Sequence, residues 1–293
     1  MTGVRLHGRS ERGFTLLELV VTIVLSAIVG SFIVLFLATP LKAYFAETRR
    51  STLIDSTERI GAAVRADART ALPNSMRVAT RGRLVALELL ATAGTARYYG
   101  AGEKNHAAGQ ELTPGIPVSS FETLNAFEPG AAGAYRAAYL AVGNLGTAGH
   151  DAYQNLSQQG VMTPAGETVS VTTPVGSAPG ENRVTLGQPM TFLADGLPSP
   201  VHAAYLVQGP VSYVCDIGAG TVRRYANYPI TALQSVPPRT RGALIATDVT
   251  ACRFSVVTDP LYGVGELAVL EVTVASQGES MTVFLEAPTE YAR

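Results

Sequence analysis

Tryptophan is absent from this sequence of 293 residues, and aromatic residues make up only 7% of it. Glycine, with 29 residues, and proline, with 17, are common by comparison. The shortage of aromatic rings argues against a binding cleft built on stacked rings, and the abundance of Gly, Ala, Thr and Val favours strands, turns and small-residue packing. Because 47% of the residues are hydrophobic, the chain can still bury a sizeable core.

The chain also lacks a large excess of positive or negative charge, since 22 basic and 23 acidic residues leave a formal net charge of -1. This balance excludes binding of nucleic acid by bulk charge, and the hydrophobic content excludes a disordered chain. We therefore expect an ordered protein without a nucleic-acid partner.

Catalytic and metal-binding motifs are missing as well. The sequence has no G-x-S-x-G, no H-E-x-x-H and no glycine loop placed between a strand and a helix to hold phosphate. The four histidines show no ligand spacing; they are His7, His106, His150 and His202. The sequence predicts that the protein is not an enzyme and uses no metal or other cofactor.

A long apolar run, Phe14–Thr39, begins near the amino terminus. About 20 apolar residues at 1.5 Å each cover the roughly 30 Å hydrocarbon core of a bilayer. The run is longer than the apolar region of a removable signal peptide, and no small-x-small cleavage site follows it before Pro40. Arginines precede it, which places the flank in the cytoplasm and the rest of the chain outside. We expect a retained, single-pass anchor.

One carboxylate, that of Glu18, interrupts the apolar run. A charged side chain inside a membrane helix costs about 2.5 to 3.5 kcal/mol on insertion scales, and less near an interface. A residue with such a cost usually has a function. The alternative is a tolerated interfacial carboxylate on a plain anchor.

The residues around this carboxylate read RGFTLLEL over positions 12–19. A basic leader ending in Gly13, followed by Phe14 and a long apolar helix, resembles the processing site of type IV prepilins and type II secretion pseudopilins. The resemblance implies that a membrane prepilin peptidase cleaves between Gly13 and Phe14 and then methylates the new amino terminus of Phe14.

The same resemblance implies a role for Glu18. Four residues separate it from the new ammonium group of Phe14, so both groups lie on one helix face and can pair within one subunit. The resemblance implies instead that Glu18 pairs with the amino terminus of a neighbouring subunit and sets the register of a helical filament. Buried ion pairs are better supported as register devices than as sources of net stability.

An amphipathic stretch follows the apolar run at residues 40–72. Its apolar residues recur at spacings of three and four, while most of its charged residues fall elsewhere. Pro40 predicts a bend, and the sequence Pro73-Asn74-Ser75 predicts the end of the helix. We expect one face of this helix to be buried against a sheet. A coiled-coil stalk or an ordinary domain helix is the alternative.

From Met76 onward the hydrophobic period becomes strand-like. A strand pair with a turn at Thr92–Gly94 is predicted first, and a hairpin turn is predicted at Gly218–Gly220. The predicted fold class is α+β, with a long amino-terminal helix packed on an antiparallel β-sheet domain, as in pilins. Its predicted parts are a leader at 1–13, a transmembrane and assembly helix at 14–39, an amphipathic helix at 40–72, and a periplasmic β-rich domain at 73–293 with a Gly/Ala/Pro/Thr-rich insertion near 101–180.

The two cysteines, Cys215 and Cys252, are expected to form a disulfide in an exported domain. The chain-entropy model values such a cross-link at about 4 kcal/mol. Two buried thiols, or a metal pair completed by histidines, are the alternatives.

A cluster of arginines and tyrosines is the remaining candidate site. Arginines at alternating strand positions occur in most sheets, so a scaffold role is favoured over ligand binding. The cluster consists of Arg223, Arg224, Tyr225 and Tyr228.

The resemblance implies a minor type IV pilin-like subunit that acts in pilus biogenesis, at initiation or at the tip, because 293 residues exceed the size of typical major pilins. Within the class, a long helix ending in ALPNS, followed by PVSYVCD and RRY, resembles the MshO-type minor prepilins of mannose-sensitive haemagglutinin (MSHA) pilus systems. A minor pseudopilin of type II secretion is the alternative within the family, and a membrane-anchored periplasmic binding protein or enzyme is the alternative outside it.

The expected partners follow from the same resemblance. They are the prepilin peptidase, other pilin or pseudopilin subunits, the inner-membrane assembly platform and membrane lipid. The expected location is the inner membrane, with the carboxy-terminal domain in the periplasm, and the pilus after assembly.

Overall fold

The computed structural model describes residues 13–103, 111–127, 135–137, 139–154, 156–173, 180–197, 199, 201–258 and 266–289. The chain divides into two compact units, Met1–Thr52 and Leu53–Arg293. One helix, α1 (Leu16–Arg69), begins in the first unit and ends in the second, and the rest of the described chain is built from strands and loops. The predicted α+β class is confirmed.

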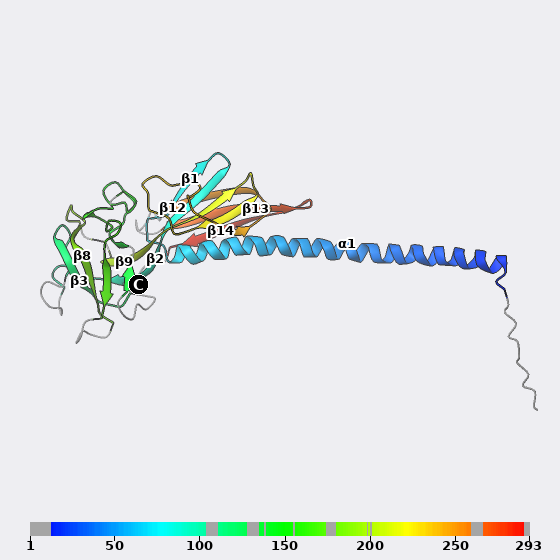
Figure 1. The fold of residues 1–293 in the computed structure, drawn as a ribbon, viewed down its shortest axis with the longest axis horizontal. Coiled ribbons are helices and arrows are strands. Elements are labelled where there is room, and N and C mark those ends of the chain that lie inside the picture. Colours follow the sequence, from blue (N-terminus) through cyan, green and yellow to red (C-terminus); the bar gives the residue numbers. More distant parts are fainter. Residues whose placement is uncertain are drawn as a thin grey trace, which may run out of the picture. The chain divides into compact units, whose positions relative to one another are not determined.

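The first unit contains the apolar part of α1. The apolar side chains here are exposed, and α1 is long and apolar enough to cross a membrane. Pro40 lies inside the helix, which Figure 1 draws as one continuous ribbon. Because proline has no backbone N–H, it removes one hydrogen bond of the helix without ending it here.

The last turns of α1, from Leu53 onward, belong to the second unit and bury one face. The apolar residues recur at helical spacing, and Ile60 and Ala68 are fully buried. Gly61 allows the closest approach, since a Cβ atom at that position would lie 2.8 Å from Cδ1 of Leu285. The expected burial of a helix face against a sheet is therefore present. The buried apolar residues on this face are Leu53, Ile60, Val64 and Ala68.

An ion pair also joins α1 to the sheet. Arg224 donates from Nε to Oδ2 of Asp67 at 2.6 Å and from Nη2 to Oδ1 at 3.0 Å. The hydroxyl of Tyr213 donates to the same carboxylate. Burial, followed by the hydrogen bond to Asp67, raises the pKa of Tyr213 well above its ordinary value. The hydroxyl therefore stays protonated as a donor.

The strands form three sheets, and Figure 1 shows β12, β13 and β14 side by side. The six-stranded sheet has the order β1-β2-β9-β10-β11, with β5 also paired to β9; the three-stranded sheet is β12-β13-β14; and the five-stranded sheet is β3-β8-β7-β4, with β6 paired to β8. The strands are β1 (Arg77–Arg81), β2 (Leu84–Arg97), β3 (Pro117–Thr123), β4 (Tyr135–Ala137), β5 (Tyr139–Val142), β6 (Gln159–Gly160), β7 (Val169–Thr172), β8 (Asn182–Phe192), β9 (Ala203–Asp216), β10 (Thr221–Tyr225), β11 (Ala243–Ala246), β12 (Val249–Thr258), β13 (Glu266–Ser276) and β14 (Glu279–Pro288).

The predicted turn at Thr92–Gly94 was wrong, because these residues lie inside β2. The register between β2 and β9 shifts between Ala91 and Thr92 and again between Thr92 and Gly94. The backbone N–H of Thr92 bonds instead to the carbonyl of Thr70, at the end of α1. The small residues therefore form a bulge that bends a continuous strand. The hairpin predicted at Gly218–Gly220 is confirmed, since β9 and β10 pair antiparallel across it.

Two large apolar clusters form the core. One lies between the end of α1 and the sheets that contain β2, β9, β12 and β13. The other collects residues of β3, β5, β7, β8 and the first half of β9, including the fully buried rings of Tyr98 and Phe192. Because β9 contributes to both clusters, it joins the two halves of the second unit.

A buried carboxylate supports the junction between helix and sheet. Oε2 of Glu266, at the start of β13, accepts a hydrogen bond from the backbone N–H of Met76 at 2.8 Å. Burial raises the pKa of Glu266 to about 7, and the backbone donors of Met76 and Ser75 oppose this rise. The folded protein therefore holds this proton more tightly than the unfolded chain, whose glutamates titrate near 4.5.

We predict that this group makes folding more stable in acid. Its contribution is fully present below about pH 4.5 and is lost as the pH rises through about 7, a change of up to about 3 kcal/mol. Glu266→Gln keeps an acceptor for Met76 but cannot ionise. Denaturant unfolding of the full chain at pH 5 and pH 8 should therefore show a loss of stability with pH that is smaller in Glu266→Gln than in the wild type.

The matched control is Glu286→Gln, which changes an exposed glutamate on β14 and should keep the wild-type dependence on pH. An equal pH dependence in wild type and Glu266→Gln would contradict the prediction.

Candidate processing and assembly site

Gly13, Phe14 and Thr15 precede the first turn of α1 in extended or irregular backbone. Phe14 is 76% exposed, and a Cβ atom built on Gly13 would meet nothing within 4 Å. Both residues are therefore open to solvent in the described structure. The predicted leader residues before Gly13 lie outside the described residues.

Thr15 caps the helix. Its Oγ1 accepts a hydrogen bond from the backbone N–H of Glu18 at 3.3 Å, and its carbonyl accepts one from the N–H of Leu19 at 3.1 Å. Thr-x-x-Glu is the pattern of a capping box, in which a threonine bonds to the third helical N–H and a glutamate can bond back. This role of Thr15 was missed from the sequence, although the spacing from Thr15 to Glu18 is a local signal for it.

Glu18 lies in the first turn of α1, where the positive end of the helix dipole favours an acid. The structure thus places the three predicted residues Gly13, Phe14 and Glu18 at one end of one helix. A positive charge at Phe14 would lie one helical turn from the carboxylate. Capping explains why glutamate suits this position in a helix, but it does not require a charge, because glutamine also serves in a capping box.

A comparison with protein families identifies a known motif at this end of the chain. Residues 8–34 match the model of the prokaryotic N-terminal methylation motif. The match supports a type IV pilin-like or pseudopilin-like subunit, and with it processing by a prepilin peptidase and assembly with other pilins. The apolar part of α1 fits the single-pass membrane anchor of such a subunit. No curated protein and no solved structure matches the chain.

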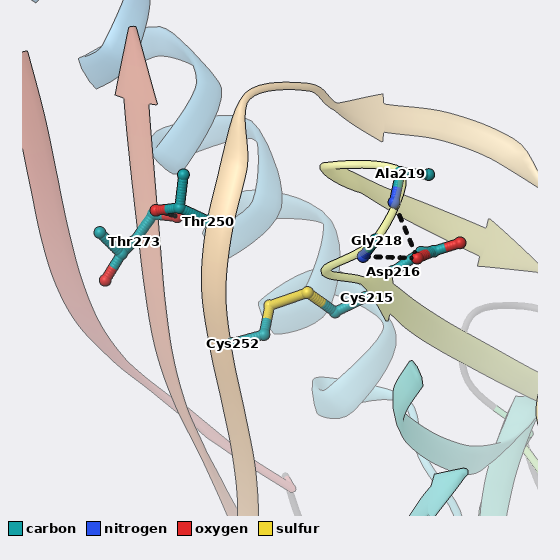
Figure 2. The surroundings of a disulfide bond; sticks show 7 residues. All are labelled: Cys215, Asp216, Gly218, Ala219, Thr250, Cys252 and Thr273. Atoms are coloured by element: carbon teal, nitrogen blue, oxygen red, sulfur yellow. Dashed lines mark hydrogen bonds between the residues drawn. A yellow bond between two sulfur atoms is a disulfide. The ribbon is translucent and has the colours of Figure 1, made fainter. Parts of the chain in front are cut away.

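The disulfide lies in the second unit, as Figure 2 shows. Cys215, near the end of β9, is bonded to Cys252 on β12, and their Cα atoms are 6.4 Å apart. The neighbouring turn is held by Asp216, whose Oδ1 accepts from the N–H groups of Gly218 at 2.8 Å and Ala219 at 2.9 Å (Figure 2). Because β9 and β12 belong to different sheets, the disulfide joins two sheets that share no strand.

The cluster of arginines and tyrosines on and after β10 makes internal contacts. Arg224 binds Asp67 on α1, and Arg223 donates to the carbonyl of Gly242 at 3.1 Å. The hydroxyl of Tyr228 donates to Oε2 of the buried Glu88 at 2.9 Å. These contacts join Arg223, Arg224 and Tyr228 to the fold, as a scaffold role requires. Among the residues that the structure describes, no group of three potential ligands could hold a metal ion.

We predict that replacing both cysteines lowers the stability of the protein. The variant Cys215→Ala/Cys252→Ala frees the loop between β9 and β12, and its free energy of unfolding should fall by about 2 to 5 kcal/mol under oxidising conditions. Denaturant unfolding measures the change. Thr250→Ala, an exposed change two residues from Cys252, is the control and should have a much smaller effect.

Two free thiols in the unfolded, unreduced wild-type protein would contradict the disulfide. A double variant that is as stable as the wild type would contradict the predicted contribution of the disulfide to stability.

Proposed function

We propose that this chain is a minor pilin-like structural subunit that takes part in pilus biogenesis, at initiation or at the tip. The observation that supports the proposal most is the methylation motif over residues 8–34, together with the exposed Gly13–Phe14 bond and the carboxylate of Glu18 one turn beyond it. The motif supports pilin-like and pseudopilin-like subunits alike. The resemblance to MshO-type minor prepilins favours the pilus assignment.

The proposed location follows from the anchor and the disulfide. The apolar part of α1 holds the precursor in the inner membrane, and the β-rich unit lies in the periplasm. A disulfide between Cys215 and Cys252 supports this side of the membrane, because such bonds persist in oxidising compartments. After processing, the subunit leaves the membrane and enters the filament.

In this proposal the peptidase cleaves after Gly13 and methylates Phe14. A residue without a side chain suits a peptidase that must approach the backbone closely. Gly13→Val therefore should leave the uncleaved precursor in the membrane. Mass spectrometry of the amino terminus, in a strain with an active prepilin peptidase, should find methylated Phe14 in the wild type and an intact leader in the variant.

Gly30→Val is the matched control for this experiment. It makes the same substitution inside α1, where a Cβ atom would meet nothing within 4 Å, so its cleavage should be normal. An intact leader on the wild-type protein would refute the proposed processing.

Removing the charge of Glu18 distinguishes a role in assembly from roles in membrane anchoring and in helix capping. Glu18→Gln keeps the size and the capping capacity of the side chain but removes its charge. If Glu18 pairs with the terminal ammonium of a neighbouring subunit in a medium of low dielectric constant, the loss of one partner costs about 3 to 5 kcal/mol. We predict that Glu18→Gln and Glu18→Val are exported, cleaved and stable in the membrane, yet fail to restore pili in a strain lacking this gene.

Glu47→Gln changes an exposed glutamate farther along α1 and should restore pili. Normal piliation by Glu18→Gln would show that capping, not charge, is what the filament needs. If the wild-type gene restores secretion instead of pili, the pseudopilin alternative holds.

A further inference from the structure

A polar cleft lies on the second unit, beside strand β1. Its volume is about 360 Å³, which is room for a short stretch of an extended chain. One wall is β1 and the other is the segment between β10 and β11. It is lined by Ala79, Thr80, Arg81, Gln234, Ser235, Val236, Pro237 and Arg239.

The charged residues that line the cleft, Arg81 and Arg239, are both basic. Arg81 and Arg239 stand on opposite walls, and neither has a carboxylate partner among the residues that the structure describes. Within the described part of the chain, the guanidinium groups make one long hydrogen bond, 3.4 Å from Nη1 of Arg81 to the carbonyl of Val236. None of the described residues that line the cleft is acidic. Two arginines in this arrangement attract a carboxylate, because guanidinium groups match its geometry.

A buried acceptor points to a ligand that also donates. Nε2 of Gln234 donates to the carbonyl of Ala86 at 3.2 Å, whereas its Oε1 is buried and has no hydrogen-bond partner in the described part of the chain. A buried acceptor without a partner loses its hydrogen bonds to water and gains none in return. Because Gln234 lines the cleft, a ligand N–H group that reaches this side chain would satisfy the acceptor.

The backbone of β1 completes the cleft wall. Ala79, Thr80 and Arg81 are consecutive, so their side chains alternate between the two faces of the sheet, and all three can line one cleft only if the strand's own backbone is part of the wall. β1 is an edge strand that pairs with β2 alone in the described structure. Every second residue of an edge strand directs its N–H and C=O away from its neighbour, where an added strand can pair with them.

We propose that this cleft binds an extended peptide segment that carries carboxylates, laid along the edge of β1. The carboxylates bind Arg81 and Arg239, a peptide N–H donates to Oε1 of Gln234, and the peptide backbone pairs with β1. An acidic sugar would satisfy the arginines, but the lining has no aromatic ring on which a sugar could stack and offers a strand edge that a sugar cannot pair with. The site does not depend on the proposed function of the amino-terminal motif.

The test uses the full-length protein in detergent micelles and a fluorescent, end-capped pentapeptide in which valine alternates with aspartate. Fluorescence anisotropy should show saturable binding that weakens with salt. Replacing both aspartates of the peptide by asparagine should abolish binding. Arg81→Gln and Arg239→Gln should each weaken binding about tenfold, because each removes one charge-assisted contact.

Arg83→Gln is the control, since it removes an exposed arginine two residues from Arg81 that does not line the cleft. Its affinity for the peptide should equal that of the wild type, and thermal unfolding of all three variants should match the wild type. The proposal is overturned if the acidic peptide does not bind, if binding survives both arginine substitutions, or if an oligomer of galacturonic acid displaces the peptide at lower concentration than the unlabelled peptide does.

Discussion

Burial of one face of α1 against the sheets is the contact on which the second unit depends. Ile60, Val64 and Ala68 place apolar side chains in a core that also receives β2, β9 and β13. The bidentate ion pair between Asp67 and Arg224 then fixes the position of the helix along the sheet, because its two hydrogen bonds can form together in only one position. Without the helix, the apolar residues of two sheets on this side would face water.

The end of the helix is coupled to the sheets through its backbone as well. Leu72 donates to the carbonyl of Leu90 at 2.7 Å, and Thr92 donates to the carbonyl of Thr70 at 2.9 Å. These two bonds pair backbone groups where the chain passes from helix to sheet. The side chain of Asn144 extends the same junction by donating to the carbonyl of Pro73 at 2.7 Å. Helix, strands and the loop around Asn144 thus share one set of hydrogen bonds.

The features that could be predicted from the sequence are those that depend on short spacings between residues. The apolar run, the amphipathic stretch, the hairpin at Gly218–Gly220 and the α+β class follow from periods of two and of three to four residues. The motif over residues 8–34 was also identifiable, since Gly13, Phe14 and Glu18 lie within six positions, and the roles of these three residues stay predictions. The interpretation of Glu18 was incomplete because only its cost in a membrane and its pairing with an amino terminus were considered, whereas its backbone N–H also donates to the capping hydroxyl of Thr15.

What the sequence could not predict are contacts between distant residues. Asp67 and Arg224 lie 157 positions apart, and Met76 and Glu266 lie 190 apart, so neither pair has a local signal. Thr92–Gly94 was taken for a turn because small residues favour turns, yet pairing along β9 kept β2 continuous through a bulge. Gln234 and Arg239 show no pattern at all; only the folded chain places them opposite Arg81.

The disulfide also has a mechanical consequence. Between Cys215 and Cys252 lie β10, β11 and the segment that carries Gln234 and Arg239. Tension that enters along β9 and leaves along β12 passes directly through the sulfur–sulfur bond, so the enclosed segment carries none of the load. Strand β1, the other wall of the cleft, lies outside this covalent loop, so tension that separates β1 from β2 opens the cleft while the wall that carries Gln234 and Arg239 keeps its length.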